Sequence, residues 1–360
     1  MTPVAAPLPP DRRIRNRALR AADLAGRRAR FASRPPMLQV EPTSRCNLAC
    51  PICARNTYDR ARNPPGDLSP EVLARVAPLF PDAEDVVLGG YGEPLLGALT
   101  WEILERAKRA GCRVELITNG TLLSGEAAAR LVALGADRVV VSVDASSDAK
   151  MRAIRGVDLR DVVDRLMGLS EIKRAHRTPA PEVEISFTAS RENVEDLAPL
   201  IDIAEQVGAR GVRVRLQKVY AAAQRERPLL LDRAQAGREF ARATDRARAT
   251  GIRLDLPSLA GEPRECRQPL DLLFVRWNGD VRGCCSAVFE NDGYNFPVGN
   301  VLDEDLDALW NAPPMVAYRE ALWAGDAAAL PANCRGCAFR RDDLAAQYRV
   351  LDAPAREEGA

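Results

Sequence analysis

The sequence predicts an α/β protein, a partial (β/α)6 TIM-like barrel followed by a small C-terminal domain made of a β-hairpin and a helix. Six short segments rich in Val, Ile and Leu recur between residues 37 and 216, with helix-start signals between them. Alternating strands and helices are typical of a parallel sheet. Further on, the pair Asn278 and Gly279 predicts a tight antiparallel hairpin. A curled parallel sheet carries its functional residues at the carboxyl ends of its strands.

The barrel strands are predicted at residues 37–41, 85–89, 113–118, 138–144, 183–188 and 212–216. Ser69 before Pro70 and Ser124 before Gly125 are typical first residues of the intervening helices. Gly208 and Gly211 lie just past a predicted helix end, where a left-handed residue is favoured. After the hairpin, helices are expected at residues 303–311 and 315–323.

Alternation along the strands predicts a polar interior, because neighbouring side chains on a strand point to opposite faces. The apolar face must pack on the helices, so the polar face is expected inside. Its residues are Glu115, Asn119, Glu184, Thr188, Arg213, Arg215 and Gln217. We therefore expect a polar substrate, with Glu184, Arg213 and Arg215 as candidate substrate contacts. The alternative is that these side chains only neutralise one another inside a wet barrel.

Charge and cysteine content narrow the function classes. The chain has 51 Lys and Arg against 50 Asp and Glu, which predicts neither nucleic-acid nor membrane binding. Neither a bilayer-spanning apolar run nor a signal segment is evident, so we expect a cytoplasmic protein. In that compartment, nine cysteines indicate metal ligands rather than disulfides.

The Arg-rich segment 11–34 carries Ile14, Leu19, Leu24 and Phe31 loosely spaced as on one helical face. It predicts a solvated helix packed across the barrel. A nucleic-acid or membrane arm is the alternative, which the acidic residues elsewhere in the chain disfavour.

Three thiols, Cys46, Cys50 and Cys53, follow the first predicted strand directly. Thiolates select zinc, copper(I) or iron–sulfur clusters, and a structural zinc site would normally have a fourth Cys or His. No such residue is near in sequence. An iron–sulfur cluster held by three cysteines would leave one iron open to a small molecule.

The run Arg45-Cys46-Asn47-Leu48-Ala49-Cys50-Pro51-Ile52-Cys53 resembles the signature of the radical S-adenosylmethionine (radical SAM) enzymes. The resemblance implies a 4Fe-4S cluster whose fourth iron chelates SAM. It also implies reductive cleavage of SAM to a 5′-deoxyadenosyl radical that abstracts a hydrogen atom from substrate.

The same resemblance implies SAM contacts at the ends of the strands. Gly89-Gly90-Tyr91-Gly92-Glu93 looks like the family's motif for the methionyl ammonium group, with Gly92 and Glu93 as the matching positions; alone it would be a tight turn. Thr118-Asn119-Gly120 resembles another family motif or is a plain strand-to-helix turn. The full set of predicted SAM-binding residues is Gly92, Glu93, Asn119, Ser142, Asp144, Arg155 and Gln217.

A second cysteine set lies in the C-terminal region, which resembles the SPASM/twitch extension of radical SAM enzymes. The resemblance implies one auxiliary 4Fe-4S cluster, held by Cys266, Cys284, Cys334 and Cys337, with Gly279 at the family's glycine position before Cys284. A zinc site is the alternative. Cys285 could replace Cys284, be idle, or return a hydrogen atom to a substrate radical. The predicted domains are 1–36, a basic N-terminal extension, partly disordered or helical; 37–258, the barrel; 259–342, the SPASM/twitch domain; and 343–360, a C-terminal tail.

The leading functional hypothesis is dehydrogenation or epimerisation of a polar metabolite such as a sugar, aminocyclitol or nucleoside. The alternative is modification of a ribosomally made peptide, and a more remote one is a non-catalytic zinc-binding protein. Few residues precede the first strand, so no separate peptide-recognition domain is expected there. By resemblance, a flavodoxin or ferredoxin would donate the electron.

Overall fold

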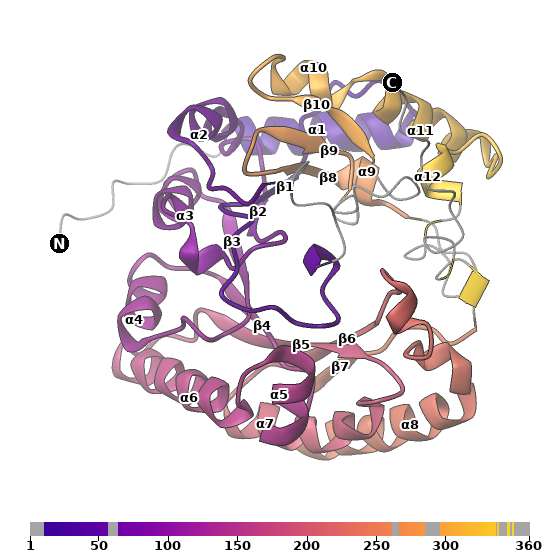
Figure 1. Cartoon of the computed structure of the whole chain (residues 1–360). Helices are drawn as coiled ribbons and strands as arrows, with labels where there is room; N and C mark the ends of the chain where they lie inside the picture. Colours follow the sequence, from indigo (N-terminus) through magenta and orange to yellow (C-terminus); the bar gives the residue numbers. More distant parts are fainter. Residues whose placement is uncertain are drawn as a thin grey trace.

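A computed structural model describes residues 11–56, 64–260, 266–284 and 296–335, together with 337, 344, 345 and 348. In these ranges the strands form one curved sheet with the order β10-β9-β8-β1-β2-β3-β4-β5-β6-β7. Figure 1 shows helices along its outer side and the cysteine-bearing segment after β1 crossing its inner side. The strands are β1 (Met37–Val40), β2 (Asp85–Leu88), β3 (Arg113–Thr118), β4 (Arg138–Ser142), β5 (Glu182–Ala189), β6 (Gly211–Leu216), β7 (Arg253–Asp255), β8 (Leu272–Val275), β9 (Asp280–Arg282) and β10 (Pro297–Asn300).

The predicted fold class is confirmed. Strands β1 to β6 pair in parallel in sequence order, as their alternation with helices requires. Two features were not predicted. A short seventh strand, β7, extends the sheet beyond β6. At the other edge β8 pairs in parallel with β1, with Met37 opposite Leu272 and Val40 opposite Val275. The predicted hairpin of β8 and β9 therefore extends the barrel sheet.

Helices cover the outer face, and the core lies between them and the sheet (Figure 1). The main α-helices are α1 (Asp11–Ala25), α2 (Pro70–Val76), α3 (Thr100–Arg109), α4 (Gly125–Ala133), α5 (Asp148–Arg155), α6 (Leu159–Ala175), α7 (Leu197–Gln206), α8 (Arg233–Thr250), α9 (Gln268–Asp271), α10 (Leu306–Trp310), α11 (Pro313–Ala324) and α12 (Ala332–Arg335). Across the described part of the chain, none of them combines the length and apolarity needed to span a bilayer.

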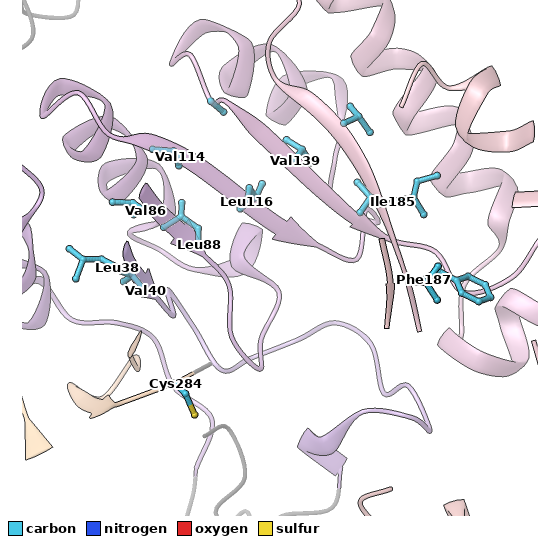
Figure 2. Close-up of a cluster of buried hydrophobic side chains, with 14 of the residues drawn as sticks. Leu38, Val40, Val86, Leu88, Val114, Leu116, Val139, Ile185, Phe187 and Cys284 are labelled. Carbon is cyan, nitrogen blue, oxygen red and sulfur yellow. The ribbon is translucent and has the colours of Figure 1, made fainter. Parts of the chain in front are cut away.

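The outward-facing strand residues are apolar, as the alternation predicted. Figure 2 shows Leu38 and Val40 of β1 beside Val86 and Leu88 of β2, followed by Val114 and Leu116 of β3. All of these are fully buried and belong to the same cluster as helix residues. Burying an apolar side chain of this size stabilises the folded state by about 1.5–3 kcal/mol. The outer face of the sheet is therefore covered by helices, and a ligand can reach the sheet only from its inner face.

Helix boundaries follow the predicted caps with one error. Ser69 Oγ accepts a bond from Val72 N, and Ser124 Oγ accepts one from Ala127 N, both at 3.2 Å. Gly208 is left-handed, with φ +70°. The prediction for Gly211 is wrong, because this residue opens β6. A Cβ there would lie 2.8 Å from the carbonyl oxygen of Arg253, so close approach of β7 is what favours glycine at this position.

Helix α1 packs across the sheet with its arginines engaged by the protein itself. Arg12 pairs with Asp82 at 2.5 Å and Arg17 with Glu84 at 2.8 Å. Arg20 donates to the Leu270 carbonyl oxygen at 2.6 Å and pairs with Asp271, next to β8. These contacts give three arginines of the segment partners within the protein.

The chain after α1 also joins the C-terminal helices. The guanidinium of Arg319, on α11, is fully buried between the rings of Phe31 and Trp310, 3.9 and 4.3 Å from their centroids. It donates to the carbonyl oxygens of Ala29 and Trp310 at 3.2 and 3.0 Å, and to Asn311 Oδ1 at 3.2 Å. One cation thus joins two segments nearly 300 residues apart in sequence.

We expect Arg319→Ala to lower the free energy of unfolding by about 3 kcal/mol, because charged hydrogen bonds and two ring contacts are lost at a buried position. Urea denaturation would measure it. Arg242→Ala is the matched control, since that guanidinium is mostly exposed and, within the described part of the chain, pairs with Glu239 of the same helix alone. The control should change stability by no more than about 0.5 kcal/mol. Equal effects of the two substitutions would contradict the role given to Arg319.

Candidate active site

The main candidate site is a cavity of about 380 Å³ on the inner side of the sheet. Its walls include residues at the carboxyl ends of four neighbouring strands: Thr118 of β3, Ser142 of β4, Thr188 of β5 and Leu216 of β6. Parallel strands bring these ends together at one edge of the sheet, as the barrel prediction required. The site is therefore built mainly from the short loops that follow the strands.

Cys46, Cys50 and Cys53 all line this cavity, on the loop that follows β1. The loop is held by bonds to its own backbone. Cys53 N donates to the Cys50 oxygen at 2.9 Å, and Asn56 Nδ2 donates to the same oxygen at 2.7 Å. Burial raises the pKa of the Cys50 and Cys53 thiols. Three soft donors therefore face one space, and the described residues that line it include no fourth Cys or His.

The glycine-rich loop after β2 lies directly against the cysteine loop. A Cβ on Gly92 would lie 2.2 Å from the Thr43 oxygen and 2.5 Å from the Arg45 oxygen, so only glycine fits there. Glu93 N donates to that Arg45 oxygen at 2.8 Å. The two loops therefore share a backbone contact just before the first thiol.

Glu93 is 2% exposed and lines the cavity. Its carboxylate accepts bonds from Asn119 N at 2.8 Å, Thr118 Oγ1 at 2.7 Å and Leu95 N at 3.2 Å. Burial raises the pKa of Glu93, and these bonds oppose the rise. Since a carboxylate offers about four lone-pair positions, one remains for a cationic ligand.

The Asn119 side chain connects the turn after β3 to the cysteine loop. Its Nδ2 donates to Asn47 Oδ1 at 3.0 Å and lies 3.8 Å from Cys46 Sγ. Asn119 Oδ1 accepts a bond from Thr121 N at 2.9 Å. The turn thus has a structural role and also places an amide beside the first thiol.

Ser142 and Arg155 line the cavity, but Asp144 is absent from its lining residues. The Asp144 carboxylate is fully buried, bound to Arg155 Nε and Thr188 N at 2.6 Å each. Burial lowers the pKa of Arg155, but Asp144 together with the nearby Cys50 and Cys53 thiols more than offsets it, so the pKa is raised overall. The prediction that Asp144 contacts SAM is therefore wrong: the carboxylate is buried behind the cavity wall and holds Arg155, which does line the cavity.

The segment after β6 forms another wall, with Arg215, Gln217, Lys218 and Tyr220 lining the cavity. Gln217 is 3% exposed, and among the described residues its Nε2 has no hydrogen-bond partner. Gln224, further along this segment, donates from Nε2 to the Pro51 oxygen of the cysteine loop at 2.8 Å. Tyr220 and Gln224 were not predicted as site residues; their position after the carboxyl end of β6 was the available signal.

The other two candidate substrate residues, Glu184 and Arg213, lie in a separate cavity. They pair with each other at 2.5 Å, and Arg253 of β7 also pairs with Glu184. Glu115 pairs with Arg138 nearby at 3.1 Å. Along β5, Glu184 precedes Thr188 by four residues, which is about 13 Å of strand. The predicted polar interior is therefore divided between two cavities. In the cavity that holds Glu184 and Arg213, the alternative of mutual neutralisation applies.

In the second cysteine set, Cys266 and the residue before Cys284 contact α11. Cys284, Cys334 and Cys337 are buried and Cys266 is half-buried. The Cys266 oxygen accepts a bond from Tyr318 Oη at 2.5 Å, and a Cβ on Gly283 would lie 2.8 Å from Met315 Sδ. Both contacts are to α11. Cys285, the candidate hydrogen donor, lies outside the described residues.

Two family models match the two parts of the chain that carry the cysteine sets. A model of the radical SAM superfamily matches residues 40–179, which include the first three thiols and both following loops. The chain belongs to the radical SAM superfamily. A SPASM model, described as an iron-sulfur cluster-binding domain, matches residues 266–338. The chain is therefore a radical SAM enzyme with a C-terminal SPASM domain.

Two relatives differ in how much of the chain they match. A tungsten-containing aldehyde ferredoxin oxidoreductase cofactor-modifying protein of Pyrococcus furiosus is 28% identical over 45% of this chain, and the match spans 46% of that protein. The PqqA peptide cyclase of Gluconobacter oxydans is 28% identical over 86% of this chain and 84% of its own length. SuiB of Streptococcus suis, solved bound to S-adenosylmethionine, has the same fold: the TM-score is 0.65 at 17% identity, covering 84% of this chain and 71% of SuiB.

Radical SAM and SPASM membership means that the cofactors are 4Fe-4S clusters and S-adenosylmethionine. The first site fits this pair. Three thiols, a backbone approach that only Gly92 permits, and the buried Gln217 amide all face one cavity. In the described ranges, no three His, Cys, Asp or Glu side chains converge as ligands of a single metal ion would. Cluster cysteines bind different irons, so they need not converge in this way.

We expect Gly92→Ala to weaken SAM binding at least tenfold, because the added Cβ must push the loop away from the cysteine loop. Equilibrium dialysis of the loaded enzyme with labelled SAM would measure this. Gly168→Ala is the matched control, since a Cβ there, within α6, meets no atom within 4 Å. SAM binding by the control should equal that of wild type. Wild-type affinity in Gly92→Ala would refute the close contact.

Proposed function

We propose that this radical SAM enzyme modifies a ribosomally made peptide. The observation that carries the proposal is the match to the PqqA peptide cyclase, which extends through both the barrel and the SPASM region. Further PqqA peptide cyclases match the same 86% share of this chain. SuiB, which has the same fold, has been solved bound to its precursor peptide SuiA. These likenesses support a peptide better than the sugar, aminocyclitol or nucleoside that the sequence favoured.

The residues of the main cavity divide into three groups in this proposal. Cys46, Cys50 and Cys53 would hold the first cluster. The residues Gly92, Glu93, Asn119, Ser142, Arg155 and Gln217 would bind SAM, with Glu93 offering its remaining lone pair to the ammonium group. When bound, cluster and SAM supply a radical that abstracts a hydrogen atom from substrate. Arg215, Lys218 and Tyr220, on the wall after β6, are left to face the substrate.

The auxiliary cluster would be held by Cys266, Cys284, Cys334 and Cys337. The four thiols lie on three segments of the described chain: before α9, after β9, and at and after α12. A cluster there would join these segments, as metal sites do when their ligands come from distant parts of a chain. A flavodoxin or ferredoxin as electron donor is part of the same proposal.

The iron content separates the two cysteine sets. We expect about eight irons per chain after anaerobic reconstitution, and about four in the Cys46/Cys50/Cys53→Ala triple variant. Iron, sulfide and zinc analysis would measure this, with Cys112→Ala as the control because Cys112 is buried, bonds to the Phe80 oxygen and does not line the main cavity. Zinc without sulfide would refute both cluster assignments. Four irons plus one zinc in wild type would refute the auxiliary assignment alone.

The substrate class can be tested directly. The loaded enzyme, reduced by flavodoxin, would be incubated with SAM and with short peptides encoded beside its gene, each labelled with deuterium. We expect deuterium to appear in 5′-deoxyadenosine and the peptide mass to change. The Cys46/Cys50/Cys53→Ala variant, which lacks the first cluster, is the control.

Deuterium transfer from a labelled sugar, aminocyclitol or nucleoside, with none from the peptides, would overturn the peptide proposal. It would leave the radical SAM assignment unaffected, because hydrogen abstraction would still have occurred. Absence of SAM cleavage by a protein with a full complement of iron would count against the roles given to the cavity residues.

A further inference from the structure

Glu41 is a fully buried carboxylate that lies outside the lining of the main cavity. It follows the last residue of β1 and precedes Cys46 by a short turn. Its backbone N donates to the Val275 oxygen of β8 at 2.9 Å. An isolated buried carboxylate is costly, so its partners are the key to its role.

The two oxygens of Glu41 bind two different parts of the protein. Oε1 accepts a hydrogen bond from Tyr91 N at 2.7 Å, in the glycine-rich loop. Oε2 lies 3.5 Å from Arg276 Nε and accepts a bond from Trp277 N at 3.4 Å, in the turn of the β8–β9 hairpin. One side chain therefore connects the candidate SAM loop with the first hairpin of the SPASM region.

The surrounding contacts make this junction tight. Arg276 is 2% exposed, and its guanidinium lies over the Tyr91 ring at 5.5 Å. A Cβ on Gly90 would lie 2.5 Å from Glu41 Oε1, so glycine makes room for the carboxylate. The loop can therefore reach its position only while the carboxylate and the guanidinium keep theirs.

The hairpin also contacts the cysteine loop from the other side. The ring of Trp277 packs on Gly66, where a Cβ would lie 2.1 Å from Trp277 Cζ3. Gly66 exchanges bonds with Ser44, two residues before Cys46: Ser44 N donates to the Gly66 oxygen and Gly66 N donates to Ser44 Oγ, both at 2.9 Å. At its far end, β9 leads within two residues to Cys284. A connected set of contacts thus runs from Cys284 through the hairpin to both loops of the first site.

We propose that Glu41 is a positioning residue that couples the SAM-binding loop at residues 91–93 to the SPASM hairpin, so that the two cofactor regions influence each other's binding. The inference rests on the proposed SAM-binding role of that loop. Glu41 acts through the Tyr91 backbone and touches no SAM itself. Because coupling between two sites is reciprocal, the state of the hairpin changes SAM affinity as much as SAM changes the state of the hairpin.

The test compares Glu41→Gln with Asp23→Asn in the cluster-loaded protein. Asp23 is also fully buried, accepts a backbone bond from Ser33 N at 2.8 Å and pairs with Arg28, but it lies on α1 away from the cavity. Both substitutions keep the shape of the side chain and remove its charge. We expect similar thermal midpoints and full iron content for the two variants.

The expected difference is in SAM binding alone. In Glu41→Gln the dissociation constant for SAM should rise about tenfold, with a changed SAM-dependent EPR signal of the reduced cluster, while Asp23→Asn matches wild type in both. Adding Arg276→Gln to Glu41→Gln should cause little further loss, because the pair acts as one unit. If Glu41→Gln does not fold, Arg276→Lys should give a smaller rise in the same direction.

Wild-type SAM affinity and EPR signal in Glu41→Gln, or in Arg276→Lys if that variant replaces it, would overturn the inference and leave Glu41 a purely structural residue. Additive losses in the double variant would also overturn it. The proposed function fails in a distinguishable way, since wild type itself would then bind no SAM or lack the first cluster.

Discussion

The parallel pairing of β8 with β1 is the constraint on which most of this structure depends. It turns β1 from an edge strand into an interior one, with β2 on one side and β8 on the other. Both neighbours then deliver their following loops to the same end of β1. That end carries Glu41 and the cysteine loop, so the SAM loop and the SPASM hairpin meet there. Without β8, the Glu41 carboxylate would lose Arg276 and its enclosure.

Buried charges mark the junctions between segments distant in sequence. Arg319 joins the chain after α1 to α11, and Glu41 joins the two loops of the first site to the hairpin. A buried charge tolerates no partial separation from its partners, because the uncompensated ion costs several kcal/mol. We infer that these junctions favour one arrangement of the barrel and the C-terminal region.

The inner side of the sheet divides its polar residues by position along the strands. At the carboxyl ends they face the main cavity, where Gln217 retains an unused amide among the described residues. Four residues earlier along β5 and β6, Glu184 and Arg213 pair with each other, and Glu184 also pairs with Arg253. The same alternation pattern thus places polar residues both at the cavity and further back along the strands. The residues further back are neutralised by opposite charges on neighbouring strands.

The fold class, both cysteine sets and the motif loops could be predicted from the sequence alone, because strand alternation, helix caps and thiol spacing are local properties. Even so, the sequence could not distinguish Glu184 and Arg213 from Arg215, since all three alternate identically with apolar neighbours. Three outcomes could be seen only in the folded protein: Asp144 is buried behind the cavity and holds Arg155, Gly211 allows β7 to approach β6, and β8 pairs with β1. These outcomes depend on which residues lie opposite one another across strands, and pairing between distant segments leaves no local pattern in the chain.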